Sequence, residues 1–188
     1  MKTGPKTNRP DPTEIILEGK RCLLVPLTKS KFAIIDKEDG PLVVQHAWVA
    51  KSYGSIQKTW YAERRLRNYE GGNGRCIKLH RFLTGEKFID HINCNGLDNR
   101  RSNLRKATPS QNAGNSRLSA ISSTGFKGVS YRGPKGNRRG RWVARINDNG
   151  RRVSLGSFQN VRLAALAYNV AAFEKWGSFA RLNTFETT

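Results

Sequence analysis

Residues 90–112 read DHINCNGLDNRRSNLRKATPSQN, and this stretch decides how the first half of the chain folds. It begins where a short apolar run ends, and Asn95-Gly96 within it is a typical hairpin turn. Thr108-Pro109 supplies a helix cap followed by proline at the first helical position. The order of these signals predicts one strand, a second strand and a short helix.

This unit can bring a carboxylate, an imidazole and a carboxamide around one point, as phosphodiester hydrolysis requires. Oxygen atoms of Asp90 and the Asn112 side chain suit a hard divalent cation, which neutralises charge on the phosphate and the leaving oxygen. A neutral His91 can accept the proton of the attacking water. We therefore expect one Mg²⁺ or Mn²⁺ ion per active site, whereas an Asp-His pair alone would favour an ordinary surface turn.

The same stretch resembles a known family. With LHRF at residues 79–82, the elements DHI, LDNRRSNLR and QN are similar to HNH endonucleases of the zinc-free phage and intron-encoded homing type, in which the last His is replaced by Asn. The resemblance covers about residues 21–117 and implies a ββα-metal (His-Me finger) unit that needs no zinc. It also implies a general base at His91, an orienting residue at Asn103 and metal ligands at Asp90 and Asn112.

Other polar residues near the motif have competing interpretations. We interpret His80 as a packing or phosphate-contacting residue and His46 as a core histidine, so both stay outside the catalytic set. Asn95 and Asn99 are rivals of Asn103 by residue type, but they fall in the predicted turn. The residues expected to contact phosphates, with solvated surface charge as the alternative, are Arg100, Arg101 and Arg105.

The second half of the chain has a clearer strand pattern. RWVARIN at residues 141–147 alternates with a period of two, which places Trp142, Ala144 and Ile146 on an inner face and the residues between them on an outer face. A half-buried strand with a basic outer face follows from this pattern.

A hairpin and a helix follow this strand. Asn149-Gly150 predicts a tight turn, and RRVSL at residues 151–155 continues as the next strand. The Ala-rich segment after it predicts a helix with a cap at Asn160 and an end near Gly177.

From residue 125 to residue 183 the chain resembles the plant ethylene-response-factor (Apetala-type) DNA-binding domain, which also occurs fused to phage HNH endonucleases. FKGV, WVARI, LGSF and ARLN carry the likeness. It implies a three-stranded antiparallel sheet in the major groove with a helix packed on its back. The positions that it assigns to DNA contact are Lys127, Ser130, Arg132, Arg141, Arg145, Asn147, Arg152 and Ser154. Three of these, Ser130, Asn147 and Ser154, depart from the plant pattern, so the base preference does not carry over.

The N-terminal region is expected to be rich in strands. Short apolar runs with β-branched residues predict strands at residues 21–26 and 31–36, with further strands within 43–50 and 59–64. Residues 77–83 are too few to separate strand from helix by periodicity. The expected fold class is α+β: a β-rich region leading into the ββα-metal unit, and a C-terminal three-stranded antiparallel sheet packed on one helix.

Composition divides the chain into segments and limits its partners. LSAISSTG at residues 118–125 is rich in small and hydroxyl-bearing side chains, as linkers are. The expected organisation is a basic tail at residues 1–12, an HNH domain at 13–117 with its motif at 79–112, a linker at 118–125 and an ethylene-response-factor-type domain at 126–184.

The charge is extreme for a chain of this length. In 188 residues there are 34 Lys and Arg against 14 Asp and Glu, a formal net charge of +20. A field of this sign attracts polyanions. No apolar window approaches the roughly 20 residues of a spanning helix, and the first twelve residues lack a signal-peptide pattern. We therefore expect an intracellular protein that is not secreted and has no membrane partner.

The combined interpretation is a metal-dependent DNA endonuclease of the homing type, positioned by its C-terminal domain. Nicking is the default outcome, because a single site cuts one strand. The expected partner is double-stranded DNA, bound as a monomer or a transient dimer, without a small-molecule cofactor. The alternative is a DNA-binding regulator or recombination accessory protein whose HNH unit is vestigial. RNA binding lacks a recognised single-strand module.

Overall fold

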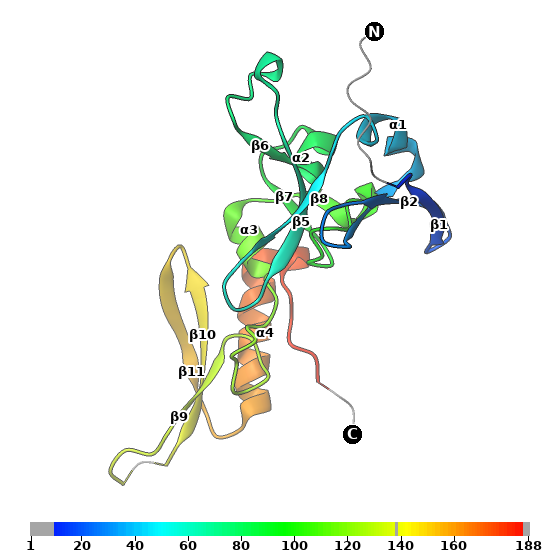
Figure 1. Ribbon diagram of the computed structural model, residues 1–188. Coiled ribbons are helices and arrows are strands. Elements are labelled where there is room, and N and C mark those ends of the chain that lie inside the picture. The colour runs from blue at the N-terminus through cyan, green and yellow to red at the C-terminus, as the bar shows by residue number, and fades with distance from the viewer. Residues whose placement is uncertain (1–9, 138, 186–188) are drawn as a thin grey trace. The chain divides into compact units, whose positions relative to one another are not determined.

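The computed structural model describes residues 10–137 and 139–185, so residues 1–9 of the predicted tail lie outside the described residues. The chain forms two compact units, Met1–Lys106 and Ala107–Thr188, and each is described by itself (Figure 1). The structure is of mixed α/β type, with small sheets and few helices.

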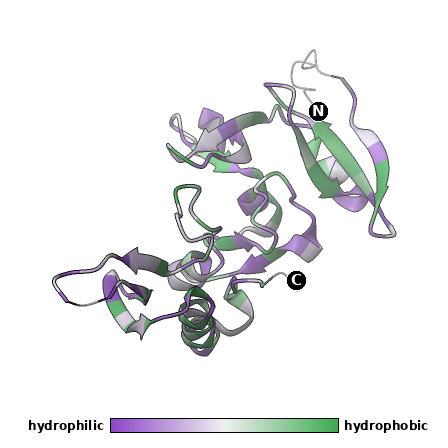
Figure 2. Ribbon diagram, turned by 90° about the horizontal axis from the view of Figure 1, so that it is seen from below, coloured by the Kyte–Doolittle hydropathy of each residue, from purple (hydrophilic) through white to green (hydrophobic). Residues whose placement is uncertain are grey.

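Unit 1 begins with an antiparallel sheet in the order β1-β2-β3. Its strands are β1 (Thr13–Leu17), β2 (Lys20–Pro26) and β3 (Phe32–Asp36). The strands predicted at residues 21–26 and 31–36 are confirmed. The strand β1 was not predicted, because its TEIIL segment is short. Figure 2 shows green, apolar residues along the strands of this sheet near the N-terminus.

A second sheet, in the order β4-β5-β6, follows a helical turn. Its strands are β4 (Val49–Tyr53), β5 (Thr59–Arg65) and β6 (Cys76–Lys78), preceded by η1 (Lys37–Asp39) and α1 (Gly40–Val43). The strand expected within residues 43–50 is therefore wrong over most of its length. Pro41 lies in the first turn of α1, where its fixed φ favours a helix, and Val43 is buried from there.

The ambiguous residues 77–83 contain both types of structure. β6 ends at Lys78 and α2 (Leu79–Thr84) begins directly after it. Leu79 and Leu83 of α2 join a core that includes Ile35 of the first sheet and Trp48 before the second. One apolar cluster thus connects the two three-stranded sheets of unit 1 with the helix that leads into the motif.

The motif stretch itself forms two very short strands. β7 (Ile89–His91) pairs antiparallel with β8 (Leu104–Lys106), and η3 (Arg101–Asn103) leads into β8. Between the strands lies a loop, residues 92–103, rather than the tight hairpin expected from Asn95-Gly96. A turn forms one residue later than expected: the Asp98 N–H donates to the Asn95 carbonyl at 3.0 Å, so that Gly96 and Leu97 are its central residues.

Unit 2 contains an antiparallel sheet in the order β11-β10-β9 with a long helix packed against one face (Figure 1). Its elements are α3 (Pro109–Gly114), β9 (Val129–Arg132), β10 (Arg141–Asp148), β11 (Arg151–Phe158), α4 (Val161–Trp176) and η4 (Gly177–Phe179). The strands expected at residues 141–147 and 151–155 are confirmed, as is the helix capped by the Asn160 side chain.

Small side chains let α4 lie close to the sheet. Ala164, Ala165 and Ala172 of α4 and Ala144 of β10 are completely buried. They pack with larger groups in two adjoining clusters, one around Val129 and the other around Ile146, Tyr168 and Trp176. The inner face of the sheet is thus the apolar face that the period-two pattern predicts.

The boundary between the units differs from the expected linker. The division falls between Lys106 and Ala107, and residues 118–125 lie inside unit 2. The reason is that α3 packs against α4 and so groups with the C-terminal sheet. Among residues 10–137 and 139–185, no helix has the length and apolar character needed to cross a membrane.

Gly96 offers a test of how tightly the motif loop is packed. A Cβ atom at Gly96 would lie 2.5 Å from the Trp60 carbonyl oxygen and 2.6 Å from the Tyr61 ring. Because backbone cannot yield as a flexible side chain does, we expect Gly96→Ala to destabilise the protein by about 1–3 kcal/mol. Thermal unfolding measures the loss. Gly133→Ala is the matched control, since nothing lies within 4 Å of its Cβ position; equal melting temperatures for the two variants would contradict the expectation.

Candidate active site and DNA-binding face

The pairing of β7 with β8 sets the positions of the acidic residue and the imidazole. Asp90 lies opposite Arg105 and His91 opposite Leu104 in the antiparallel register. All three residues of β7 are buried, and Asp90 and His91 are only 4% and 6% exposed. Two ionisable groups are thus held in a largely dry environment by a strand of three residues.

Arg105 forms an ion pair with Asp90. Its Nε and Nη2 atoms donate to the same carboxylate oxygen, Oδ2, at 2.9 and 2.8 Å. Arg105, expected to contact phosphate, is therefore engaged with the predicted metal ligand. A carboxylate has two oxygens with about four lone-pair sites, so an ion pair at one oxygen is compatible with a metal at the other.

His91 packs within a group of aromatic rings. The His80 ring lies edge-on to it with centroids 4.9 Å apart, and the Tyr61 ring lies at 5.8 Å. Burial lowers the pKa of His91, while the Asn99 side chain and the Asp90 carboxylate act in the opposite direction without reversing it. The imidazole is thus biased toward its neutral form, which is the form a general base needs.

His80, which the sequence leaves outside the catalytic set, contacts the predicted base. It is 5% exposed, and burial lowers its pKa to about 3, with the neighbouring His91 as the next cause. Within the described residues, its Nδ1 atom is buried without a hydrogen-bond partner. His80 is therefore a neutral packing partner of His91. No local sequence signal predicted this contact, because His80 lies on α2 and His91 on β7.

Asn103 acts on the loop that follows His91. Its Oδ1 accepts from the Asn93 N–H at 3.0 Å, and its Nδ2 donates to Asn93 Oδ1 at 3.0 Å and to the Asp98 carbonyl at 2.8 Å. Its own carbonyl accepts from the Ile92 N–H at 2.9 Å. The carboxamide thus holds the start of the loop, and its effect on His91 is exerted through the chain that follows the imidazole.

Asn99, set aside as a turn residue, is completely buried near His91. Its N–H donates to the Ile34 carbonyl at 2.7 Å, and its Nδ2 donates to the Leu97 carbonyl at 3.0 Å. It belongs to the surroundings that set the pKa of His91. The sequence did not predict this burial, because Asn99 was expected in a tight, exposed hairpin turn. The observed loop is longer and folds back so that Asn99 is buried.

Arg100 requires a correction. Its guanidinium donates to both oxygens of Asp98, at 2.9 and 2.8 Å, and to Glu18 at 2.9 Å, and the residue is only 6% exposed. Burial raises the pKa of Asp98, but the bonds from Arg100 outweigh it, so the pKa lies below its usual value. A buried guanidinium saturated by carboxylates is a structural ion pair, and the expected phosphate contact at Arg100 is wrong.

Arg101 and Arg105 differ from Arg100 in exposure. The Arg101 side chain is 56% exposed although it pairs with Asp39 at 2.7 Å, and that of Arg105 is 19% exposed. Both retain some access to solvent, so contact with a phosphate remains a prediction for these two residues.

Asn112 lies on α3, where it is exposed. The Thr108 side chain accepts from the Gln111 N–H, and Gln111 reaches back to the Thr108 N–H, which closes a capping box at the start of this helix. Asp90, His91 and Asn103 belong to unit 1 and Asn112 to unit 2. The pairing of Asn112 with Asp90 at one metal stays a prediction that rests on the motif.

The donor set fits a hard cation. One carboxylate and one carboxamide offer oxygen ligands, and Mg²⁺ is usually bound by one or two carboxylates together with phosphate and water. In the described part of the chain, no group of three or more His, Cys, Asp or Glu residues could hold an ion by itself. Water and substrate phosphate would be the further ligands of an ion held by Asp90 and Asn112.

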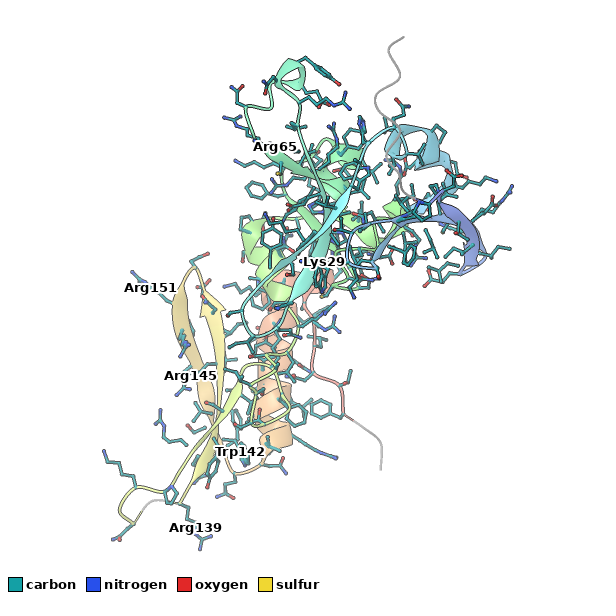
Figure 3. All side chains as sticks on the ribbon, viewed as in Figure 1. Lys29, Arg65, Arg139, Trp142, Arg145 and Arg151 are labelled. Atoms are coloured by element: carbon teal, nitrogen blue, oxygen red, sulfur yellow. The ribbon has the colours of Figure 1, made fainter. Side chains whose placement is uncertain are left out.

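The outer face of the sheet β9 to β11 in unit 2 carries most of the predicted DNA contacts. In the register, Arg141 lies opposite Arg132, Arg145 opposite Ser154 and Asn147 opposite Arg152, while Ser130 lies opposite Val143. Figure 3 shows the Arg145 side chain on the side of the sheet away from α4. These residues share one face because Ala144 and Ile146, which alternate with them, pack toward the helix.

A bond on this face orders one of the arginines. Arg145 Nη1 donates to Ser130 Oγ at 3.0 Å, which holds the guanidinium beside β9. A groove of about 850 Å³ lies between α3, the segment that follows it and β10. Arg145, Asn147 and Arg152 line it together with Arg117 and Ile121, and Tyr168 and Trp176 of α4 line it as well. Arg117 also lies at this groove. The sequence interpretation missed it, because Arg117 precedes residues 126–184, where the DNA-binding domain was expected.

Lys127 requires a second correction. Its ammonium group donates to the carbonyls of Gly114 and Ser116 at 2.6 and 2.8 Å, at the C-terminal end of α3. Its N–H and carbonyl are bound to the Asn183 side chain. The expected DNA contact at Lys127 is therefore replaced by a contact within the protein.

Comparison with known proteins gives independent evidence on the family of this chain. A model of the HNH endonuclease family matches residues 83–114. An uncharacterised HNH endonuclease of Acanthamoeba polyphaga mimivirus is 28% identical over 167 residues, 84% of this chain and 78% of that protein. Protein 3.8 of Escherichia phage T7 is 28% identical over 131 residues, 70% of this chain and 97% of that protein. Dehydration-responsive element-binding protein 2C of Arabidopsis thaliana is 48% identical over 60 residues, 31% of this chain and 18% of that protein.

No solved structure matches the chain. Residues 83–114 run from α2 through β7 and β8 to α3, so the family match contains all four residues that the motif assigns to catalysis and metal binding. These matches identify an HNH endonuclease domain in the chain and make it a DNA-cleaving enzyme.

Proposed function

We propose that the chain is a metal-dependent, homing-type HNH endonuclease that nicks double-stranded DNA and is positioned on it by the sheet β9 to β11. The observation that carries the proposal is the β7–β8 pair. It buries Asp90 and His91 on consecutive positions of one strand, pairs the carboxylate with Arg105 and biases the imidazole toward its neutral form.

In this proposal, His91 accepts the proton of the attacking water. Rings of Tyr61 and His80 limit its motion, and Asn103 fixes the loop that leaves it. Arg105 orients the Asp90 carboxylate through two hydrogen bonds to Oδ2. Asp90 and Asn112 would hold one Mg²⁺ or Mn²⁺ ion through oxygen atoms. When bound, this ion supplies charge neutralisation at the phosphate and the leaving oxygen.

The sheet of unit 2 is proposed to lie in the major groove. This placement is what the resemblance to the Apetala-type domain implies. The alignments over 60 residues with Dehydration-responsive element-binding protein 2C and with Ethylene-responsive transcription factor 1 of Solanum lycopersicum support a DNA-binding role for this part of the chain. Arginine at a base edge favours guanine and asparagine favours adenine, so Arg145, Arg152 and Asn147 are the candidates for base contact. The remaining basic residues of the face would track phosphates.

The oligomeric state and the outcome of cleavage follow from the site. One HNH unit cuts one strand, so a monomer nicks, and a double-strand break requires two copies that meet transiently on the duplex. The homing type is inferred from the likeness to phage and intron-encoded enzymes and from similarity to the phage T7 and mimivirus proteins.

The second candidate is a DNA-binding regulator or recombination accessory protein with a vestigial HNH unit. The ion pairs and the capping box around the motif are features that a scaffold alone would also keep. The ordered Asp90 and His91 in one buried strand favour the enzyme, because an inactive scaffold has no physical need for a buried, neutral imidazole beside a carboxylate.

We expect His91→Ala to lower the cleavage rate by about 10²- to 10⁴-fold, the usual contribution of a general base. Affinity for DNA should stay unchanged, because His91 is buried in unit 1. Single-turnover cleavage and gel-shift titration measure the two effects. His46→Gln is the matched control, since His46 packs against Trp48 and Phe82. Retained cleavage by purified His91→Ala protein would refute the role of His91.

The cleavage rate should rise with pH as His91 loses its proton. Burial lowers the pKa of His91 below its ordinary 6.5, so the neutral base is already present at lower pH than usual. The rise should therefore lie below pH 6.5 and the rate should level off between pH 7 and 8. Single-turnover rates at saturating protein, with DNA binding followed at each pH, measure this. A rate that keeps rising steadily beyond pH 7 would argue against His91 as the base.

A plasmid assay separates the two candidate functions. With Mg²⁺ or Mn²⁺, supercoiled plasmid should become nicked circles, and excess chelator should abolish the reaction while leaving DNA binding intact. Binding without nicking under both conditions is the result expected of a regulator with a vestigial unit. Asp90→Asn provides a control for contaminating nucleases, because nicking by a contaminant would not change with this substitution.

A further inference from the structure

The short helix α3 is built into the DNA-binding unit. Trp176, the last residue of α4, donates from Nε1 to Ser110 Oγ of α3 at 3.0 Å. Gly114 of α3 lies against the same indole: a Cβ atom there would be 2.7 Å from Trp176 Cγ and Cδ2. Glycine is thus required at this position for the close approach of the two helices.

The C-terminal end of α3 is held from two further sides. Lys127 Nζ binds the Gly114 and Ser116 carbonyls at 2.6 and 2.8 Å, which satisfies acceptors that a helix end leaves open. The Arg181 N–H donates to the Gly114 carbonyl at 3.1 Å. A positive charge at a helix C-terminus is also favourable to the helix dipole.

These contacts connect directly to the sheet. Trp176 packs in one cluster with Ile146 of β10 and Tyr168 of α4. Ile146 lies between Arg145 and Asn147, two residues of the DNA-binding face. One indole therefore touches α3 on one side and the strand that carries the proposed base contacts on the other.

Asn183 closes the connection on the second side. Its side chain exchanges bonds with the Lys127 backbone at 2.6 and 3.1 Å, and its own backbone exchanges bonds with the Asn169 side chain of α4 at 2.7 and 2.9 Å. Lys127 is thus fixed to α4 while its ammonium group holds α3. We refer to Ser110, Gly114, Lys127 and Trp176 as the α3 joint.

We propose that the α3 joint, rather than the length of residues 118–125, sets the distance between the sequence that is read and the bond that is cut. The proposal rests on the proposed function, since Asn112 of α3 is the expected metal ligand and the sheet is the expected reader. Only Ala107 and Thr108 separate β8 from α3. A fixed α3 therefore fixes one ligand of the metal relative to the DNA-binding face.

An insertion distinguishes the joint from a linker. Four Gly and Ser residues placed between Ser119 and Ala120 lengthen the chain by up to about 13 Å, or about four base pairs at 3.4 Å each. If residues 118–125 act as a tether, cleavage should spread by this amount. If the joint sets the distance, the insertion should leave the cut at the same nucleotide.

Lys127→Met and Gly114→Val are the complementary variants. Methionine keeps the length of the side chain but removes both bonds to α3, and valine drives α3 away from Trp176. We expect both to spread the cuts over neighbouring nucleotides while DNA affinity stays within about threefold of the unmodified chain. Two variants with different mechanisms guard against a folding failure in one of them, which thermal unfolding would reveal.

The test uses the full chain and a duplex selected by the His91→Ala protein from a random library. Cleavage ends are mapped for the unmodified, inserted and joint-variant chains. In parallel, iron–EDTA is attached to Asn112→Cys in a chain that also carries Cys76→Ser and Cys94→Ser. Radical cuts from this probe locate α3 on the DNA without any nuclease activity.

The two maps separate the possible failures. Sharp radical cuts that survive the insertion and broaden in the joint variants support the joint even if no enzymatic cleavage occurs, in which case the nuclease proposal fails alone. A radical map that moves with the insertion, or stays sharp in both folded joint variants, overturns the joint. A chain that selects no duplex overturns the reading function and the joint together.

Discussion

The side chain of Asn103 is the constraint on which the active site depends. β7 and β8 have three residues each, so their ladder alone supplies too few hydrogen bonds to hold a loop as long as residues 92–103. Asn103 closes this loop with three side-chain bonds, and Asp98 and Arg100 close it again with a buried ion pair. Without these contacts the strand that carries Asp90 and His91 would have no fixed partner.

The first sheet supports the same loop. Ile34 of β3 forms a bridge with Asp98, accepts from the Asn99 N–H at 2.7 Å and donates to the Leu97 carbonyl at 2.8 Å. Glu18, in the turn after β1, reaches Arg100. The N-terminal strands therefore support the motif loop, so the conformation of the motif depends on residues that lie about sixty to eighty positions earlier in the sequence.

Local signals predicted the parts of this structure that local physics determines. The alternation in residues 141–147, the Asn149-Gly150 turn and the Asn160 cap concern neighbours in sequence, and each is present. The expected strand at residues 43–50 was wrong because Pro41 starts a helical turn whose burial depends on distant residues. Arg100 and Lys127 were misassigned for a related reason, since their partners Glu18 and Gly114 are reached only after the loops fold. Asp98, two residues before Arg100, is a local partner whose signal the sequence interpretation did not use. A basic residue in a nucleic-acid enzyme is thus a poor predictor of phosphate contact until its acidic neighbours are placed.

Pairing of basic residues with carboxylates differs between the two units, because the acidic residues are unevenly distributed. Residues 1–106 contain 21 Lys and Arg and 11 Asp and Glu, and residues 107–188 contain 13 and 3, so each unit has a net charge of +10. The equal net charges hide different uses. In unit 1 the carboxylates Glu14, Glu18, Glu70, Asp90 and Asp98 hold arginines in place.

Unit 2 has three acidic residues, and one of them, Asp148, forms an ion pair with Lys175 of α4. Arg132, Arg141 and Arg152 on the outer face of the sheet β9 to β11 are exposed, and Arg145 beside them is half-buried. In unit 1 the ion pairs fix many of the arginines in place, but the excess of ten positive charges remains. Because both units keep the same net charge, long-range attraction to a polyanion should come from both of them. They differ at short range, where fewer carboxylates compete for the arginines of unit 2.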